Sequence, residues 1–183
     1  MAGFSRYLPR YAGFTIIESV LVILVIGILS AFVMSRMFGG SAFDDVVLRD
    51  QIVSLSRTAQ QSALGRTGVS LTVTPNGSGD QVSVAVIDGG GTIESVNVSM
   101  DSLSLSGDIN ETDSCGITNG AQAISSATPM TVFYDSLGNA GTSGVTGNTG
   151  AVTSAVRICI NNDPSVSVCI SPSGFAHIGD CDV

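Results

Sequence analysis

The longest apolar stretch in the 183-residue chain lies near its N-terminus. From Phe14 to Met34 there are 21 residues, and Glu18 is the only ionisable one among them. A helix of about 20 apolar residues spans the roughly 30 Å hydrocarbon core of a bilayer. The pattern therefore predicts a transmembrane N-terminal helix over residues 14–35, with one acidic side chain close to its start.

A second helical pattern follows the apolar stretch. Between Leu48 and Ala63, apolar residues recur every three or four positions, which predicts an amphipathic helix that lies against a sheet. We expect this helix, over residues 36–66, to continue the first one into the head. Gly39 and Gly40 mark an expected bend or melted point, since each glycine costs about 1 kcal/mol in a helix interior.

From residue 67 onward the apolar pattern changes to a period of two, which indicates β-strands. The predicted fold class is thus α+β, with a long N-terminal α-helix packed on a β-rich globular head of antiparallel strands over residues 67–183. Residues 106–128 are expected to form an exposed loop, and the glycine-rich residues 136–150 a mobile stretch. Strands are expected at residues 69–75, 81–88, 93–100, 130–135, 155–161, 165–171 and 174–179.

Charge separates the two ends of the chain. The segment before the apolar stretch carries Arg6 and Arg10 and no acid, so we expect it to stay on the cytoplasmic side of a membrane. The whole chain has a net charge of −8, and all seven basic residues are arginines. An acidic head repels the phosphates of nucleic acids, so no nucleic-acid partner is expected.

The four cysteines lie beyond the apolar stretch, and an even number in an oxidising compartment predicts two disulfides, for which three connectivities exist. A hairpin symmetric about Pro164 would place Cys159 opposite Cys169 and leave Cys115 to pair with Cys181. The chain has no Cys-x-x-Cys spacing, so a zinc site is disfavoured.

Enzyme chemistry is not expected from this composition. The chain has a single histidine, His177, and no lysine, so a serine or cysteine nucleophile would lack a base beyond His177. Acids such as Asp135 and Asp163 occur in turn sequences, where they ordinarily organise the turn. No catalytic residues and no cofactor are predicted.

The sequence "GFTIIE", from Gly13 to Glu18, resembles the processing site of type IV pilins and type II secretion pseudopilins. The resemblance implies that residues 1–13 are a leader and that prepilin peptidase cleaves after Gly13 and methylates the new N-terminal Phe14. It also implies that Glu18 pairs with the Phe14 amine of a neighbouring subunit. The alternative is that Glu18 lies near the membrane interface and simply reaches water.

The C-terminal sequence "ISPSGFAHIGDC" is similar in pattern to minor pilins of the GspH/FimT type, such as those of MSHA (mannose-sensitive haemagglutinin) pili. This implies a minor pilin that acts in assembly initiation or at the tip, with other pilin subunits, prepilin peptidase and an inner-membrane assembly platform as partners. The expected location is the bacterial inner membrane, with a periplasmic head, and then the filament. A type II secretion minor pseudopilin and a membrane-anchored adhesin or receptor head are the alternatives.

Overall fold

A computed structural model describes residues 15–37, 41–100, 103–110, 115, 121–179 and 181, with only the backbone described for residues 31–37, 41 and 42. The chain divides into two compact units, Met1–Gly39 and Gly40–Val183. The first contains helix α1 (Ile16–Met37), and the second contains helix α2 (Ser41–Ala63) and all the strands of the described residues.

The predicted long N-terminal helix is wrong. The described residues form two separate helices, α1 and α2, and are otherwise mostly antiparallel β-sheet. A continuous helix would have to include the pair Gly39–Gly40, at about 1 kcal/mol for each glycine. The bend predicted at this pair lies outside the described residues.

The predicted membrane anchor is also corrected. Within the described residues, neither helix is long and apolar enough to cross a membrane. This finding contradicts the predicted single-pass location in the inner membrane.

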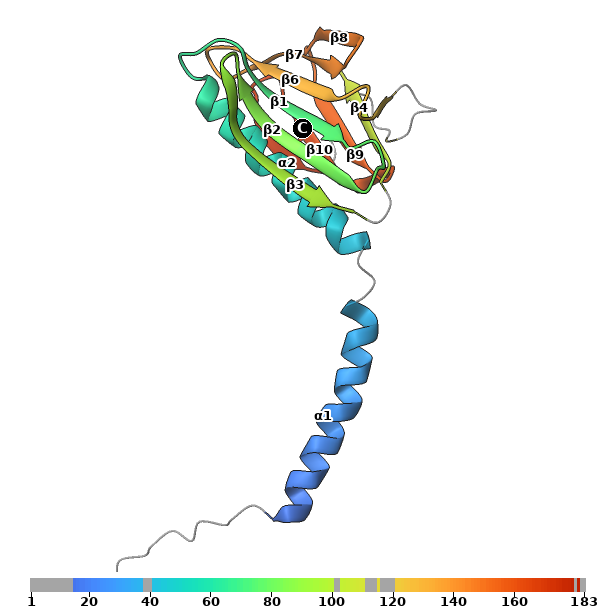
Figure 1. Cartoon of the computed structure of the whole chain (residues 1–183). Coiled ribbons are helices and arrows are strands. Elements are labelled where there is room, and N and C mark those ends of the chain that lie inside the picture. Colours follow the sequence, from blue (N-terminus) through green and yellow to red (C-terminus); the bar gives the residue numbers. More distant parts are fainter. Residues whose placement is uncertain are drawn as a thin grey trace, which may run out of the picture. The chain divides into compact units, whose positions relative to one another are not determined.

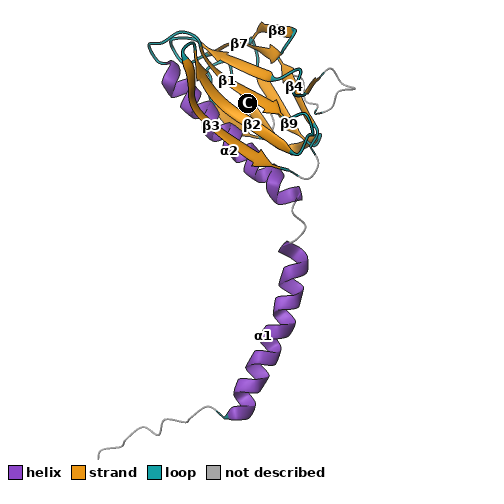
Figure 2. Cartoon of the chain, viewed as in Figure 1, coloured by secondary structure: helices purple, strands orange, loops and turns teal. Residues whose placement is uncertain are grey.

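The strands form two antiparallel sheets (Figures 1 and 2). Sheet A has the order β3-β2-β1-β6-β7-β8 and sheet B the order β11-β10-β9-β4-β5. Sheet A consists of β1 (Val69–Pro75), β2 (Gln81–Asp88), β3 (Gly91–Ser99), β6 (Met130–Tyr134), β7 (Ala140–Val145) and β8 (Asn148–Ala151). Sheet B consists of β4 (Leu105–Ile109), β5 (Gln122–Ile124), β9 (Val156–Ile160), β10 (Asp163–Ile170) and β11 (Ala176–Ile178).

The core lies between the two sheets and α2. Alternate residues of β1 and β2 point into it, because successive side chains of a strand face opposite sides of the sheet. Helix α2 contacts strands of both sheets, and Figure 1 shows it running alongside β2 and β3. Its predicted apolar stripe is confirmed as buried, at Leu48, Ile52, Leu55, Ala59 and Ala63.

The end of α2 follows from the sequence. The helix ends at Ala63, three residues before the predicted end at residue 66, and Gly65 has a φ of 73°. Glycine takes this left-handed conformation without the steric cost that a Cβ atom imposes. The N–H of Gly65 donates to the carbonyl of Ser136 at 2.9 Å, which ties this helix end to the β6–β7 turn.

Four strands lie where irregular structure was predicted. Strands β4 and β5 fall in residues 106–128 except for Leu105, and β7 and β8 fall in the glycine-rich stretch except for Ala151. Glycines in these strands allow close contact with neighbouring atoms. A Cβ atom on Gly107 of sheet B would lie 2.8 Å from the sulfur of Met130 in sheet A, so a glycine at this position allows the two sheets to pack closely. At Gly144 (φ 147°) a Cβ atom would collide with the backbone of Asn148 on the next strand.

The β9–β10 hairpin turns at a different place from the predicted one. The turn residues are Asn161 and Asn162, with φ values of 53° and 57°, as in a type I′ turn. An irregularity between Asp163 and Val168 then shifts the register, so Cys169 lies opposite Arg157 and not opposite Cys159. The symmetric hairpin about Pro164 is therefore wrong.

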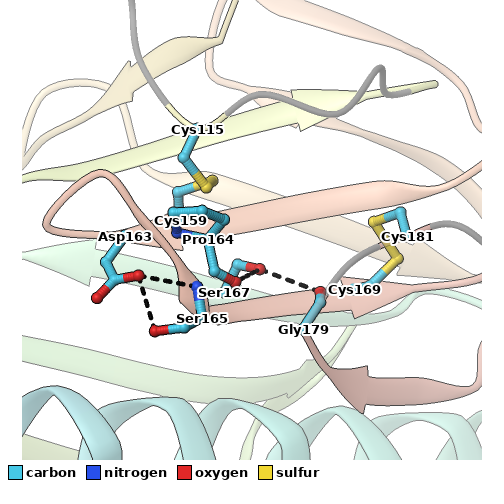
Figure 3. Close-up of a disulfide and its surroundings, with 9 residues drawn as sticks. All are labelled: Cys115, Cys159, Asp163, Pro164, Ser165, Ser167, Cys169, Gly179 and Cys181. Carbon is cyan, nitrogen blue, oxygen red and sulfur yellow. Dashed lines mark hydrogen bonds between the residues drawn. A yellow bond between two sulfur atoms is a disulfide. The ribbon is translucent and has the colours of Figure 1, made fainter.

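The change of register explains the disulfides. The prediction of two disulfides is confirmed, but the predicted pairing is wrong: the bonds join Cys115 to Cys159 and Cys169 to Cys181 (Figure 3). Cys159 and Cys169 lie on the face of sheet B opposite the core and are nonetheless buried. The disulfides link the residues at 115 and 181 to this face.

Candidate functional site

Helix α1 begins with a local hydrogen-bonded cap. The N–H of Glu18 donates to the Thr15 carbonyl at 3.0 Å and reaches the Thr15 Oγ1 atom at 3.4 Å. Thr15 thus occupies the N-cap position and Glu18 the third helical position of the Thr-x-x-Glu capping pattern. This cap was not predicted, although its signal is present in the four residues from Thr15 to Glu18.

Glu18 is exposed in the isolated chain and lies in the first turn of α1. A carboxylate at this place interacts favourably with the exposed N–H groups and the positive end of the helix dipole. Glu18 therefore has a role within its own helix, besides any role between subunits. Gly13 and Phe14 lie outside the described residues, so cleavage, methylation and the pairing of Glu18 with an amine stay predictions.

The body of α1 presents apolar side chains on every side. Eleven large apolar residues between Ile16 and Leu29 are exposed, from 43% at Val25 to 86% at Ile16. A helix that is hydrophobic all round is ordinarily buried, and exposed apolar surface of this kind marks an interaction site. The arrangement suits association through burial of apolar surface.

The acids of the head turns have structural roles. The Asp135 carboxylate accepts hydrogen bonds from the backbone N–H groups of Leu137 (2.8 Å) and Asn139 (2.9 Å), and it also accepts one from the Asn139 side chain at 3.0 Å. These bonds, led by that of the Asn139 side chain, hold the pKa of Asp135 below its usual value. Asp163 organises its turn in the same way, through the Ser165 hydroxyl and N–H.

The Asn76–Asp80 turn is built on the same principle. Asn76 Oδ1 accepts from the N–H of Gly79 at 2.8 Å, and the Asp80 carboxylate accepts from Ser78 Oγ at 2.7 Å and from the Asn76 amide. The hydrogen bond from the Asn76 side chain is the main reason that the pKa of Asp80 is lowered. The part of the chain that the structure describes contains no group of three or more His, Cys, Asp or Glu residues arranged to hold a metal ion.

His177 lies in β11 and stacks on Phe175, with ring centroids 6.2 Å apart. All four cysteines form disulfides. The head thus offers no thiol nucleophile, and its histidine is engaged with a neighbouring ring.

Comparisons of the chain with protein-family models, with curated proteins and with solved structures give no match. The functional assignment therefore depends on two features. The first is the sequence from Gly13 to Glu18, and the second is the exposed apolar surface of α1.

Proposed function

We propose that this protein is a minor pilin, a structural subunit of a type IV pilus-like filament such as an MSHA-type pilus. It acts in assembly initiation or at the tip and joins other pilin subunits through α1. The observation that carries the proposal is the exposure of apolar side chains all around α1, directly after the processing-site-like sequence that ends at Glu18.

Burial of α1 among the helices of other subunits supplies the driving force. Fully burying one Val, Leu or Ile side chain contributes about 1.5–3 kcal/mol. Eleven such residues are 43–86% exposed on α1, so their burial by neighbouring helices contributes enough to offset the roughly 4–15 kcal/mol cost of association. Apolar contact of this kind is strong but does not fix how far one helix slides along another.

In this proposal, Glu18 fixes the axial position of one helix relative to its neighbour. Cleavage after Gly13 leaves a positive amine on Phe14, four residues before the carboxylate. When helices bundle, both charges leave water, and a register that leaves either one unpaired is strongly disfavoured. Pairing between neighbouring subunits thus selects one axial stagger.

The test compares two variants at the start of α1. Glu18→Gln removes the charge, yet glutamine still fits the third position of a capping box. Thr15→Ala removes the N-cap hydroxyl and keeps the charge, at a cost of about 0.5–2 kcal/mol to the helix. If pairing sets the register, Glu18→Gln lowers incorporation into sheared filaments by more than about 100-fold, since breaking a buried pair costs about 3–5 kcal/mol. Thr15→Ala should lower it far less.

Mass spectrometry of the same proteins checks processing. We expect an N-methylated Phe14 terminus in the wild type and in Glu18→Gln, because cleavage depends on Gly13. An intact Met1 terminus in cells that contain the peptidase would refute the assignment to the type IV pilin and pseudopilin family. Normal incorporation of Glu18→Gln would refute the pairing alone. A low abundance in sheared filaments, relative to a major subunit, separates a minor pilin from a major one.

A further inference from the structure

Sheet A has one face toward the core and one face away from it. The core-facing residues of its middle strands are buried and apolar, such as Leu71, Val84 and Val132, and they belong to one cluster with residues of α2 and of sheet B. Successive side chains of a strand point to opposite sides of a sheet. The residues that alternate with these core residues therefore form the opposite surface, which we call the outer face of sheet A.

The outer face of sheet A carries no charged side chain in its six strands, all of which the structure describes. The two acids in these strands belong to the other side, because Glu94 is the register partner of buried Val86 and Asp88 lies two residues beyond Val86 on the same strand. The chain has a net charge of −8, so this face is a neutral surface on an acidic protein. Hydroxyl side chains are the commonest on it, and they include Thr72, Thr74, Ser83, Thr131, Thr142 and Thr149.

The middle of the outer face combines hydroxyl groups with apolar side chains. Thr72 and Thr131 are register partners on β1 and β6, the two middle strands of the sheet, and their Oγ1 atoms lie 3.5 Å apart. In the adjacent row, Phe133 and Ile87 lie on either side of Ser70, and Phe133 is 43% exposed. An exposed aromatic ring near the middle of a surface without charges is typical of the centre of a protein interface, where aromatic residues are enriched and charged residues depleted.

The size of the outer face suits a specific contact. Its six strands are four to nine residues long. With strands about 4.8 Å apart and about 3.3 Å per residue, the face covers on the order of 600 Å². Two such faces in contact would bury on the order of 1,200 Å² in total, which exceeds the roughly 1,000 Å² expected of a specific interface.

A second copy of the same face is the occupant that these features favour. A serine or threonine hydroxyl both donates and accepts hydrogen bonds, so a surface rich in hydroxyls is complementary to itself. A charged partner surface would lose the hydration of its charges here without gaining an ion pair. Two copies of an acidic chain repel each other through their acids, and contact between two neutral faces brings no acids into opposition.

We propose that two copies of this chain pair through the outer faces of their sheets A, with the Thr72–Thr131 pair of each copy at the middle of the contact. The same surface serves on both sides, so the contact is isologous and closes at two copies. Twisted sheets pack face to face in this way in β-sandwiches. The contact uses neither α1 nor Glu18, and it therefore stands or falls independently of the function proposed above.

Photo-crosslinking of the full-length chain tests the contact. A benzoylphenylalanine replaces Phe133, and equal amounts of isotope-labelled and unlabelled copies are mixed in mild detergent before irradiation. We expect adducts between the two kinds of copy that map to β1, β2 or β6, at residues 69–75, 81–88 or 130–134. The absence of adducts between copies, or adducts between copies that map elsewhere, would overturn the proposal.

Introduced charges supply the second readout. A substitution appears twice in an isologous contact, so Thr72→Lys and Thr72→Glu each place like charges against each other and should each lower the adduct yield by about tenfold or more. A mixture of Thr72→Lys copies with Thr72→Glu copies should restore the yield. Thr58→Lys, on α2, is the matched control and should leave the yield unchanged. An unchanged yield for Thr72→Lys, or no recovery in the mixture while both variants melt like the wild type, would also overturn the proposal.

Discussion

Tyr134 provides a direct test of how the core of the head is held together. Its hydroxyl lies 2.6 Å from Ser56 Oγ of α2, and both side chains are buried. Burial raises the pKa of Tyr134 to about 12, and the hydrogen bond with Ser56 offsets this only in part. The neutral phenol is therefore strongly favoured in the folded state.

The pH dependence follows from this shift. An unfolded tyrosine loses its proton near pH 10, about two units below the pKa of the folded state. The stabilisation is fully present below about pH 10 and is lost as the pH rises toward 12, because the unfolded state releases its proton first. At about pH 11 the free energy of unfolding should be about 1.4 kcal/mol lower than at neutral pH, and the full loss is about 2.7 kcal/mol.

The assay is urea unfolding of the wild type and of Tyr134→Phe at about pH 9, 10 and 11, a range chosen to bracket the unfolded pKa. At the lowest pH the variant should be less stable by about 1–3 kcal/mol, because the Ser56 hydroxyl is left buried without this partner. The difference should then shrink by about 1.4 kcal/mol at pH 11. The other two tyrosines are present in both proteins, so their titration cancels. A difference that stays constant over this range would refute the reasoning.

Two further predictions concern the backbone and the disulfides. Gly174→Ala should destabilise the head by more than about 3 kcal/mol in urea unfolding, since Gly174 has a φ of 80° and a Cβ atom there would collide with the Gly138 carbonyl. Gly77→Ala, with open space around it, is the control and should change little. Reduction should lower the melting temperature, because loops of 44 and 12 residues correspond to about 4 and about 3 kcal/mol in the chain-entropy model. Non-reducing peptide mapping should show Cys115 with Cys159 and Cys169 with Cys181; a Cys159–Cys169 peptide would contradict the structure.

Much of the head could be predicted from local patterns. Strands β1 and β2 have the predicted bounds, because strict alternation ends at turn residues on both sides. The buried stripe of α2 and its stop at Gly65 were predictable for the same reason, since they depend on residues within a few positions of one another. The cap at Thr15 is equally local and could have been predicted. Such features need no knowledge of distant partners.

Other features depend on residues far apart in the sequence. Strands β4, β5, β7 and β8 have weak patterns of their own, and their pairing with neighbouring strands decides their structure. The disulfide pairing followed from the irregular register of the β9–β10 hairpin, which a symmetric turn could not anticipate.

For the candidate site, the sequence by itself determined that α1 is apolar on every side and that Glu18 stands at its start, because both are properties of one helical segment. The tertiary structure decided where the surfaces of the head lie. Residues of α2 and Ile178, more than 100 positions later in the chain, line one groove of the head, and β3 and β11 end the two sheets. Local periodicity fixes which face of an element is apolar, but only the packing of all the elements decides which strands end a sheet and which surfaces lie side by side.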